Sequence, residues 1–239
     1  ISPPRISVLT EGNSSTYNAG ELIYFFEQEL GYQANYVNQL RLNNEVLSKT
    51  DVLILPSGYY NFNTIKADLI SWIRNGGTLI ALGRALDALS DTDPFEITKK
   101  ESTKDKTSDT SPNSFNKRKY ISNLITGSIY KAKVDKTHPM AYGYENFYYT
   151  LKLSGDAYKL LKNQNIAYLK SAIKPHSGFA GSNVALNQGN SLLFGNQNLG
   201  HGNIVYMVDN PLFRAFWENG KLFMANAIFF TGNRDYNNQ

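Results

Sequence analysis

The sequence predicts an α/β fold in which a mostly parallel sheet is covered by helices on both faces. Two observations in the first half of the chain support this prediction. Short β-branched or apolar runs alternate with segments whose apolar residues recur every three or four positions, and the connections between them are short. Strands joined by helical crossovers run parallel in one sheet. The pattern is therefore typical of a doubly wound, flavodoxin-like sheet, to which the second half adds further strands.

The first half begins with a strand at 5–10, followed by a loop rich in turn and cap residues. The apolar spacing over 22–30 predicts an amphipathic helix that ends at Gly31. The run at 51–55 is almost wholly apolar, so we expect it to be buried on both faces of the sheet. The remaining elements of this half are strands at 33–38 and 78–82 and a helix over 65–73.

Residues 91–118 interrupt this alternation, because they are poor in apolar residues and rich in Lys, Ser, Thr and Asp. We interpret them as a solvated insertion in a single domain of residues 1–239, with a phosphate-binding or docking arm as the alternative. The stretch 99–119 carries the whole net charge of +4. A basic protein invites a nucleic-acid interpretation, but this charge belongs to a polar stretch and not to a face of the fold. No nucleic-acid partner is therefore expected.

Short alternating or apolar runs after the insertion predict further strands and a final hairpin around a glycine-rich turn. The strands are expected at 128–134, 147–153, 166–169, 191–194 and 203–208. A closing helix is expected over 213–229. Its inward residues would be Phe216, Trp217, Leu222, Phe223, Ala227 and Ile228.

The composition excludes several classes of protein. With 239 residues, 41% apolar and 13% aromatic, the chain can bury a core and is neither disordered nor fibrous. The absence of cysteine excludes disulfides, thiolate metal sites and a cysteine nucleophile. No zinc-binding spacing surrounds the three histidines, so no metal or other cofactor is expected. Neither a membrane span nor a signal peptide is expected, and the first residues resemble an interdomain linker in a piece of a longer or processed protein.

Ligands of an open parallel sheet bind at the carboxyl ends of its strands, near the point where the strand order reverses. The candidate binding residues therefore lie in the loops after the first, third and fourth strands. Glu11 is either an acid–base group or ligand, or an acceptor for the amino terminus of the next helix. Ser57 lacks the G-x-S-x-G surroundings of a nucleophile. The candidates are Glu11, Asn13, Ser57, Tyr59, Tyr60 and Arg84.

The run TLIALGRALDAL at 78–89 predicts a strand, a sharp turn and a helix, which is the shape of a nucleophile elbow. Gly83 stands at the turn, so the elbow lacks a reactive side chain and no catalytic residue is expected. Near the end of the chain, Asp209 is interpreted as a helix cap and Arg214 as an ion-pair partner. His138, His176 and His201 are interpreted as capping or packing residues.

Five segments carry a family resemblance through their order and spacing. They are 11–26 with NAGELIYFF, 51–58 with DVLILPSG, 72–85 with WIRNGGTLIALGRA, 137–143 with THPMAYG, and 200–217 with GHGNIVYMVDNPLFRAFW. Together they are similar to the C-terminal domain of large bacterial zinc carboxypeptidase-like proteins. That domain in turn resembles the class I glutamine amidotransferase fold, and the resemblance spans nearly the whole chain.

This resemblance implies a binding domain without catalysis. In a true amidotransferase the elbow cysteine acts with a histidine and a glutamate, but here the matching motif falls on 81–85 and leaves Gly83 at the thiol position. The family's zinc ligands and catalytic glutamate belong to a separate upstream domain. The resemblance therefore implies an accessory domain of a secreted, periplasmic or cell-envelope protein. Its partners would be the upstream peptidase domain of the same chain and a peptide or glycan.

Two alternatives remain open. The first is that the chain is a sugar-binding or sugar-processing protein related to the trehalose-utilisation branch of the same fold, which uses Glu11 and a histidine. Convergence of Glu11, Arg84 and a histidine would favour this alternative, whereas histidines scattered over the surface would overturn it. A purely structural spacer is the other alternative.

Overall fold

The computed structural model describes residues 3–12, 14–101, 118, 120–171 and 173–232. The chain forms one ten-stranded sheet, whose two halves differ in strand direction. The parallel half contains β1 (Ile6–Glu11), β2 (Ala34–Asn38), β3 (Val52–Leu55), β4 (Thr78–Leu82) and β10 (Gly202–Met207). The antiparallel half contains β5 (Ile125–Val134), β6 (Phe147–Lys152), β7 (Asn165–Leu169), β8 (Ser177–Ala180) and β9 (Ser191–Leu199).

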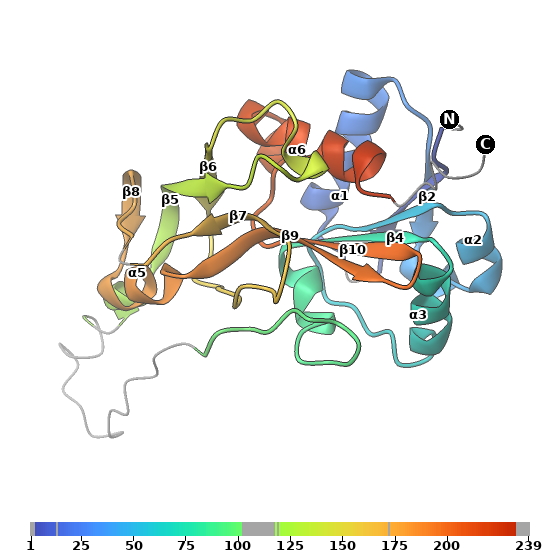
Figure 1. Ribbon diagram of the computed structural model, residues 1–239, viewed down its shortest axis with the longest axis horizontal. Helices are drawn as coiled ribbons and strands as arrows, with labels where there is room; N and C mark the ends of the chain where they lie inside the picture. The colour runs from blue at the N-terminus through green and yellow to red at the C-terminus, as the bar shows by residue number, and fades with distance from the viewer. Residues whose placement is uncertain (1–2, 13, 102–117, 119, 172, 233–239) are drawn as a thin grey trace.

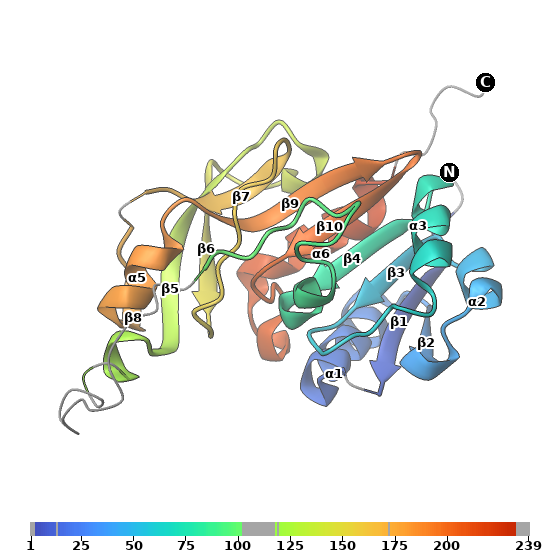
Figure 2. The ribbon, with the colours of Figure 1, turned by 90° about the horizontal axis from the view of Figure 1, so that it is seen from below.

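The strands lie in the order β2-β1-β3-β4-β10-β9-β7-β5-β6, with β8 beside β5. The direction of chain progression across the sheet reverses between β1 and β3, as in doubly wound folds. Strand β10 pairs parallel with β4 and antiparallel with β9, so it joins the two halves (Figure 2). The structure confirms the predicted flavodoxin-like α/β fold with strand-rich additions.

Helices cover both faces of the parallel half (Figure 1). Helices α1 (Thr16–Tyr24) and α6 (Glu218–Phe230) lie on one face, and α3 (Lys66–Arg74) lies on the other. Side chains of β3 alternate between the core under α1 and α6 and the core under α3, so both faces of this strand are buried as predicted. No helix in the described part of the chain is both long and apolar enough to cross a membrane. Shorter helices are α2 (Asn44–Ser48) and α5 (Ser182–Gln188).

The final hairpin differs from the prediction. The sequence predicts a long glycine-rich turn over 195–202, but β9 continues to Leu199 and the turn is confined to Gly200 and His201. Gly195 lies inside β9, where a Cβ would meet Leu161 Cδ1 at 2.7 Å. This glycine therefore serves close packing and not a turn. The short elements β8 and α5 were not predicted.

The closing helix begins later than predicted, at Glu218. Arg214 and Ala215 have φ values of 50° and 58°, which are left-handed and interrupt a helix. Phe216 and Leu222, expected on the inward side, are 58% and 42% exposed. The predicted inward residues that the structure buries are Phe223, Ala227 and Ile228.

The start of the predicted insertion is packed against the domain. Phe95 and Ile97 are buried in the core under α3. Lys99 pairs with two aspartates at 2.8 and 3.0 Å, and Lys100 Nζ donates to two backbone carbonyls at 2.8 and 2.7 Å. The interpretation as a solvated insertion is therefore wrong for this part, and two of its cations have structural roles. Residues 102–117 lie outside the described part of the chain.

Candidate binding cleft

A cleft of about 790 Å³ lies at the carboxyl ends of the parallel strands. Its walls come from the loops after β3, β4 and β10, from the start of α1, and from the end of β6 with the segment after it. This is the edge at which the strand order predicts a ligand site. The lining includes Tyr17, Glu21, Tyr24, Ser57, Gly83, Arg84, Leu153, Asp156, Asp209, Phe213 and Arg214.

Gly83 forms the sharp turn that the sequence predicts after β4. Its φ of 53° is left-handed, and a Cβ at this position would lie 2.9 Å from Ser57 Oγ. The backbone N–H of the next residue, Arg84, donates to the same Ser57 Oγ at 3.2 Å. The N–H after an elbow nucleophile is an oxyanion donor in enzymes of this geometry. Ser57 thus fills the space beside the turn and engages that donor.

Arg84 extends from this elbow along the cleft. Its Nη1 donates to the hydroxyl of Tyr59, and its guanidinium carbon lies 5.4 Å from the centroid of the Tyr59 ring. Tyr59 is 60% exposed and stands beside the cleft. A cation–π contact at an exposed site stabilises by about 0.5–1 kcal/mol. Tyr59 therefore orients Arg84 without occupying all of its N–H donors.

A buried carboxylate holds the turn after β10. Glu21 on α1 is 8% exposed and accepts hydrogen bonds from Asn18 Nδ2 at 3.0 Å, from Asn210 Nδ2 at 2.5 Å and from the backbone N of Arg214 at 2.6 Å. Arg214 and Ala215 are consecutive left-handed residues, which cost of order 1–2 kcal/mol each. The hydrogen bonds to Glu21 offset this strain and fix Arg214 at the cleft.

A second buried carboxylate connects the two halves of the sheet. Asp209 follows β10, and its Oδ1 lies 2.8 Å from Lys152 Nζ. Its Oδ2 accepts a hydrogen bond from Thr150 Oγ1 at 2.6 Å. Both partners belong to β6, and Lys152 is 1% exposed. The interpretation of Asp209 as a helix cap is wrong, because its carboxylate binds β6.

Asp156, in the wall after β6, belongs to a third charged cluster. Its carboxylate lies 3.0 Å from Lys99 Nζ, and the same ammonium contacts Asp87 at 2.8 Å. Burial opposes ionisation of Asp156, but Lys99, a serine hydroxyl and Arg84 together hold its pKa below the ordinary value. The carboxylate is therefore ionised near neutral pH and shares the ammonium of Lys99 with Asp87.

Three of the predicted candidates, Glu11, Tyr59 and Tyr60, lie outside the cleft lining. Glu11 accepts a hydrogen bond from Asn38 Nδ2 at 2.5 Å. Tyr60 stacks on Phe62 with ring centroids 5.7 Å apart and donates to a backbone carbonyl at 2.8 Å. Burial raises its pKa, which suits a packing role. Asn13 lies outside the described residues.

The three histidines lie on separate elements, and none lines the cleft. His138 caps the 3₁₀ turn Pro139–Ala141, as predicted, and His176 packs against a tyrosine ring. His201 lies in the β9–β10 turn, at the amino end of β10. The structure thus does not bring Glu11 together with a histidine. Within the described ranges, no group of three or more histidine, aspartate or glutamate side chains is placed to hold a metal ion.

Most of the charged residues of the cleft are not among the candidates predicted from the sequence. Glu21 lies in an amphipathic helix, where a carboxylate is typical of the solvent side. Lys152 sits in an alternating strand, and its partner lies 57 residues away. One signal was available for Asp209. Like Glu11, it is a carboxylate at the carboxyl end of a predicted strand, where ligands of an open parallel sheet bind.

Comparison with known proteins shows which solved structures share this fold. No protein-family model and no curated protein sequence matches the chain. Among solved structures, it is similar to a ThuA-like protein from Bacteroides uniformis, with 14% identity and a TM-score of 0.58 over 95% of this chain and 91% of that chain. It is also similar to a glutamine amidotransferase from Thermotoga maritima, with 8% identity and a TM-score of 0.52 over 96% of this chain and 100% of that chain.

A third similar structure is the β-galactosidase from Bacillus circulans sp. alkalophilus. The identity is 12% and the TM-score 0.57, over 94% of this chain but only 30% of that chain. At these identities the likeness shows the fold alone. The chain therefore has the ThuA-like, class I glutamine amidotransferase-like fold, which confirms the amidotransferase-like part of the sequence resemblance and leaves its zinc carboxypeptidase part as a prediction.

Proposed function

We propose that this chain is a non-catalytic binding domain whose cleft takes a small carbohydrate. The observation that carries the proposal is the mixture of aromatic and hydrogen-bonding side chains in one cavity of about 790 Å³. Small-molecule sites have volumes of about 300–1,000 Å³. A sugar ring packs its C–H face on an aromatic ring, and its hydroxyls need donors and acceptors around the edge. Tyr24 and Phe213 line the cleft with aromatic rings, and Ser154 and Asn210 line it with polar side chains that also bond within the protein.

The elbow supports a role without catalysis. Gly83 provides no nucleophile, and the hydroxyl of Ser57 already engages the N–H of Arg84 that would bind an oxyanion. No histidine lines the cleft to act as a base. The function therefore rests on binding, and the Glu11–histidine form of the sugar-processing alternative has no support from this geometry.

The similar structures favour a carbohydrate over other small ligands. They include two ThuA-like proteins and two β-galactosidases, each β-galactosidase being matched over 30% of its own length. Two enzymes named for a sugar substrate thus contain a segment with this backbone. This is a fold-level analogy, and the side chains of the cleft carry the argument.

Calorimetric titration of trehalose, glucose and galactose, together with a glycan array and a peptide library, tests the proposal. We expect a sugar to bind the wild-type chain, and Tyr24→Ala or Phe213→Ala to weaken it at least about tenfold. Tyr142→Ala is the control, because Tyr142 is 52% exposed and outside the cleft lining. Comparing Tyr59→Ala with Tyr60→Ala distinguishes the contribution of the exposed ring beside the cleft from that of the ring packed on Phe62. Selective binding of peptides, or no binding at all, would contradict the proposal.

The family resemblance suggests a narrower context, which we retain as a proposal. The domain would then be an accessory part of a secreted or cell-envelope zinc carboxypeptidase-like protein, beside its upstream peptidase domain. The test is the full reading frame: an HxxE zinc motif encoded before Ile1 is the expected result. A frame without a peptidase domain would reject this context and leave the binding cleft unaffected.

A further inference from the structure

We infer that the sugar bound in this cleft carries a carboxylate or phosphate group, which Arg84 and Arg214 hold. This inference rests on the proposed carbohydrate-binding function and adds the chemical class of the ligand. The two side chains, called the arginine pair below, line one cleft from the loops after β4 and β10, which are adjacent strands. A guanidinium presents a fork of N–H donors that matches two oxygens of a carboxylate or phosphate.

The acidic side chains of the cleft are already engaged. Asp209 lies 2.8 Å from a buried lysine, Asp156 lies 3.0 Å from another lysine, and Glu21 accepts three hydrogen bonds. By contrast, no ion pair among the described residues involves Arg84 or Arg214. The interpretation of Arg214 as an ion-pair partner is therefore wrong for the described chain. Neither guanidinium is therefore held by a carboxylate in this part of the chain, although the charge of Asp156 acts on Arg84.

The arginine pair is also held in position. Arg84 follows the left-handed Gly83, and its guanidinium leans on the ring of Tyr59. Arg214 is itself left-handed, and its guanidinium carbon lies 5.3 Å from the centroid of the Phe213 ring. An aromatic face orients a guanidinium and leaves edge N–H donors for a ligand. Backbone strain of this kind persists where the surrounding structure maintains it, and it is concentrated at ligand sites.

The neighbouring helix adds to the same potential. The first turn of α1 lines the cleft through Ser15, Tyr17 and Asn18. The amino end of a helix carries a partial positive charge from its free N–H groups. Its field and that of the arginine pair favour the same sign of ligand, so a neutral sugar would leave the strongest electrostatic feature of the cleft unused.

Calorimetric titration with three matched probes, glucose, glucuronate and glucose 6-phosphate, and with inorganic phosphate as the anion without a sugar, tests the inference. We expect one of the anionic probes to bind the wild-type chain at least about tenfold more tightly than glucose, since hydrogen bonds to a charged group are the stronger ones. Arg84→Gln and Arg214→Gln should each remove most of this advantage of the anionic probe over glucose. Arg214→Lys, which keeps the charge but loses the fork, should fall between wild type and Arg214→Gln.

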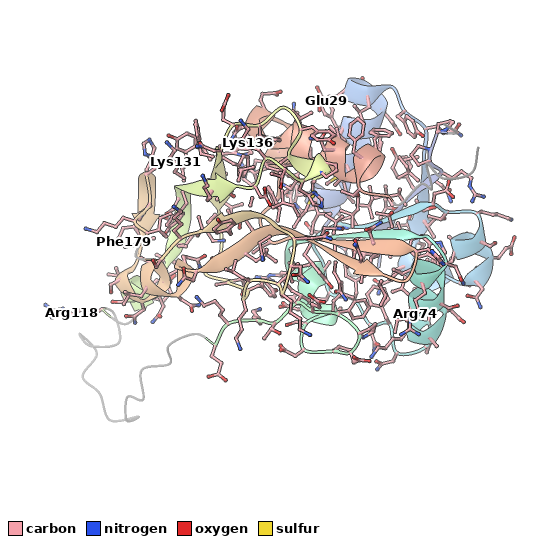
Figure 3. The ribbon with its side chains drawn as sticks, viewed as in Figure 1. Glu29, Arg74, Arg118, Lys131, Lys136 and Phe179 are labelled. Atoms are coloured by element: carbon pink, nitrogen blue, oxygen red, sulfur yellow. The ribbon has the colours of Figure 1, made fainter. Side chains whose placement is uncertain are left out.

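Arg74→Gln is the matched control. Arg74 ends α3, and its carbonyl accepts the N–H of His201 in the β9–β10 turn, so it lies at the opposite edge of the parallel strands (Figure 3). Equal binding of glucose and both anions, unaffected by the arginine variants, would overturn the inference and leave the proposed function intact. Binding of inorganic phosphate at the arginine pair without any preference for its sugar ester would overturn the proposed function. No binding of any probe would reject both.

Discussion

The parallel and antiparallel halves of the sheet differ in the kind of side chains that they bury. In the parallel half, β3 is buried along its length and wholly apolar. In the antiparallel half, β6 buries Thr150 and Lys152, and each of these needs a partner. A buried apolar strand needs only apolar side chains packed against it, whereas each buried polar group of a strand needs its own hydrogen-bond or ion-pair partner. The parallel half therefore follows from local pattern, and the antiparallel half depends on distant contacts.

The cleft belongs to both halves. The parallel strands contribute the elbow at Gly83 and the turn that holds Arg214, while the segment after β6 contributes Leu153 and Asp156. The Lys152–Asp209 pair connects β6 to the end of β10 beneath the cleft. The parallel half, which is the common part of the fold, thus forms one wall of the cleft, and the antiparallel half forms the other.

The largest effect is expected where the halves are joined. Lys152→Met leaves the carboxylate of Asp209 buried without its cation, and we expect the free energy of unfolding to fall by about 3–5 kcal/mol. Lys152→Met combined with Asp209→Leu should recover much of the loss, because no uncompensated charge remains. Urea unfolding followed by tryptophan fluorescence measures both. Lys49→Met, which removes an exposed pair with Glu45, is the control and should leave the midpoint unchanged. A small effect of Lys152→Met would show that the halves do not depend on this pair.

The second largest effect is expected at the elbow of the parallel half, where Gly83 lies. Gly83→Ala places a Cβ 2.9 Å from Ser57 Oγ at a left-handed φ, so we expect a loss of about 2–3 kcal/mol in unfolding free energy. Gly31→Ala is the matched control, because its φ of 57° is similar but its Cβ would meet nothing within 4 Å. It should lose only about 1–2 kcal/mol. Equal losses at the two glycines would mean that Ser57 does not crowd the elbow.

The turn after β10 should show a similar but smaller loss. Glu21→Gln keeps the shape of the side chain but replaces an acceptor oxygen by an amide donor that faces other donors. We expect a loss of about 1.5–2 kcal/mol, measured by urea unfolding. Glu145→Gln, at an exposed carboxylate 3.8 Å from Lys136, should change stability by less than about 0.5 kcal/mol. If the two substitutions cost the same, Glu21 does not hold the turn.

The smallest effect concerns Asp156 and is sensitive to pH. Despite its burial, its lysine partner holds its pKa below the ordinary value of 3.8. Since the folded state favours the ionised form, this stability is present above the unfolded-state pKa and is lost as the pH falls through the lower folded-state pKa. At pH 7 we expect the free energy of unfolding of wild type to exceed that of Asp156→Asn by less than about 1 kcal/mol, because the Asp156–Lys99 pair is partly exposed. The gap should close as the pH falls below the unfolded-state pKa and through the lower folded-state pKa in urea titrations, and a gap independent of pH would contradict the assignment.

The same contrast explains what could be predicted from the sequence. The parallel strands and the elbow at Gly83 follow from short-range patterns, and the structure reproduces them. The cleft was placed at the correct edge, and Ser57 and Arg84 do line it. Glu21 and Lys152 could not be found, because their roles depend on partners far along the chain. Arg214 was misinterpreted because a helical pattern gives no warning of a left-handed turn.

The central claim is that a cleft built by both halves binds a small sugar. The most direct test is calorimetric titration of glucose, glucuronate and trehalose into wild type and into Leu153→Arg, which introduces a bulky charged side chain from the antiparallel wall. Leu186→Arg on α5 is the control, because Leu186 is 77% exposed and lies outside the cleft lining. We predict that at least one sugar binds wild type and Leu186→Arg equally and fails to bind Leu153→Arg. Equal binding to both variants, or no binding to wild type, would contradict the claim.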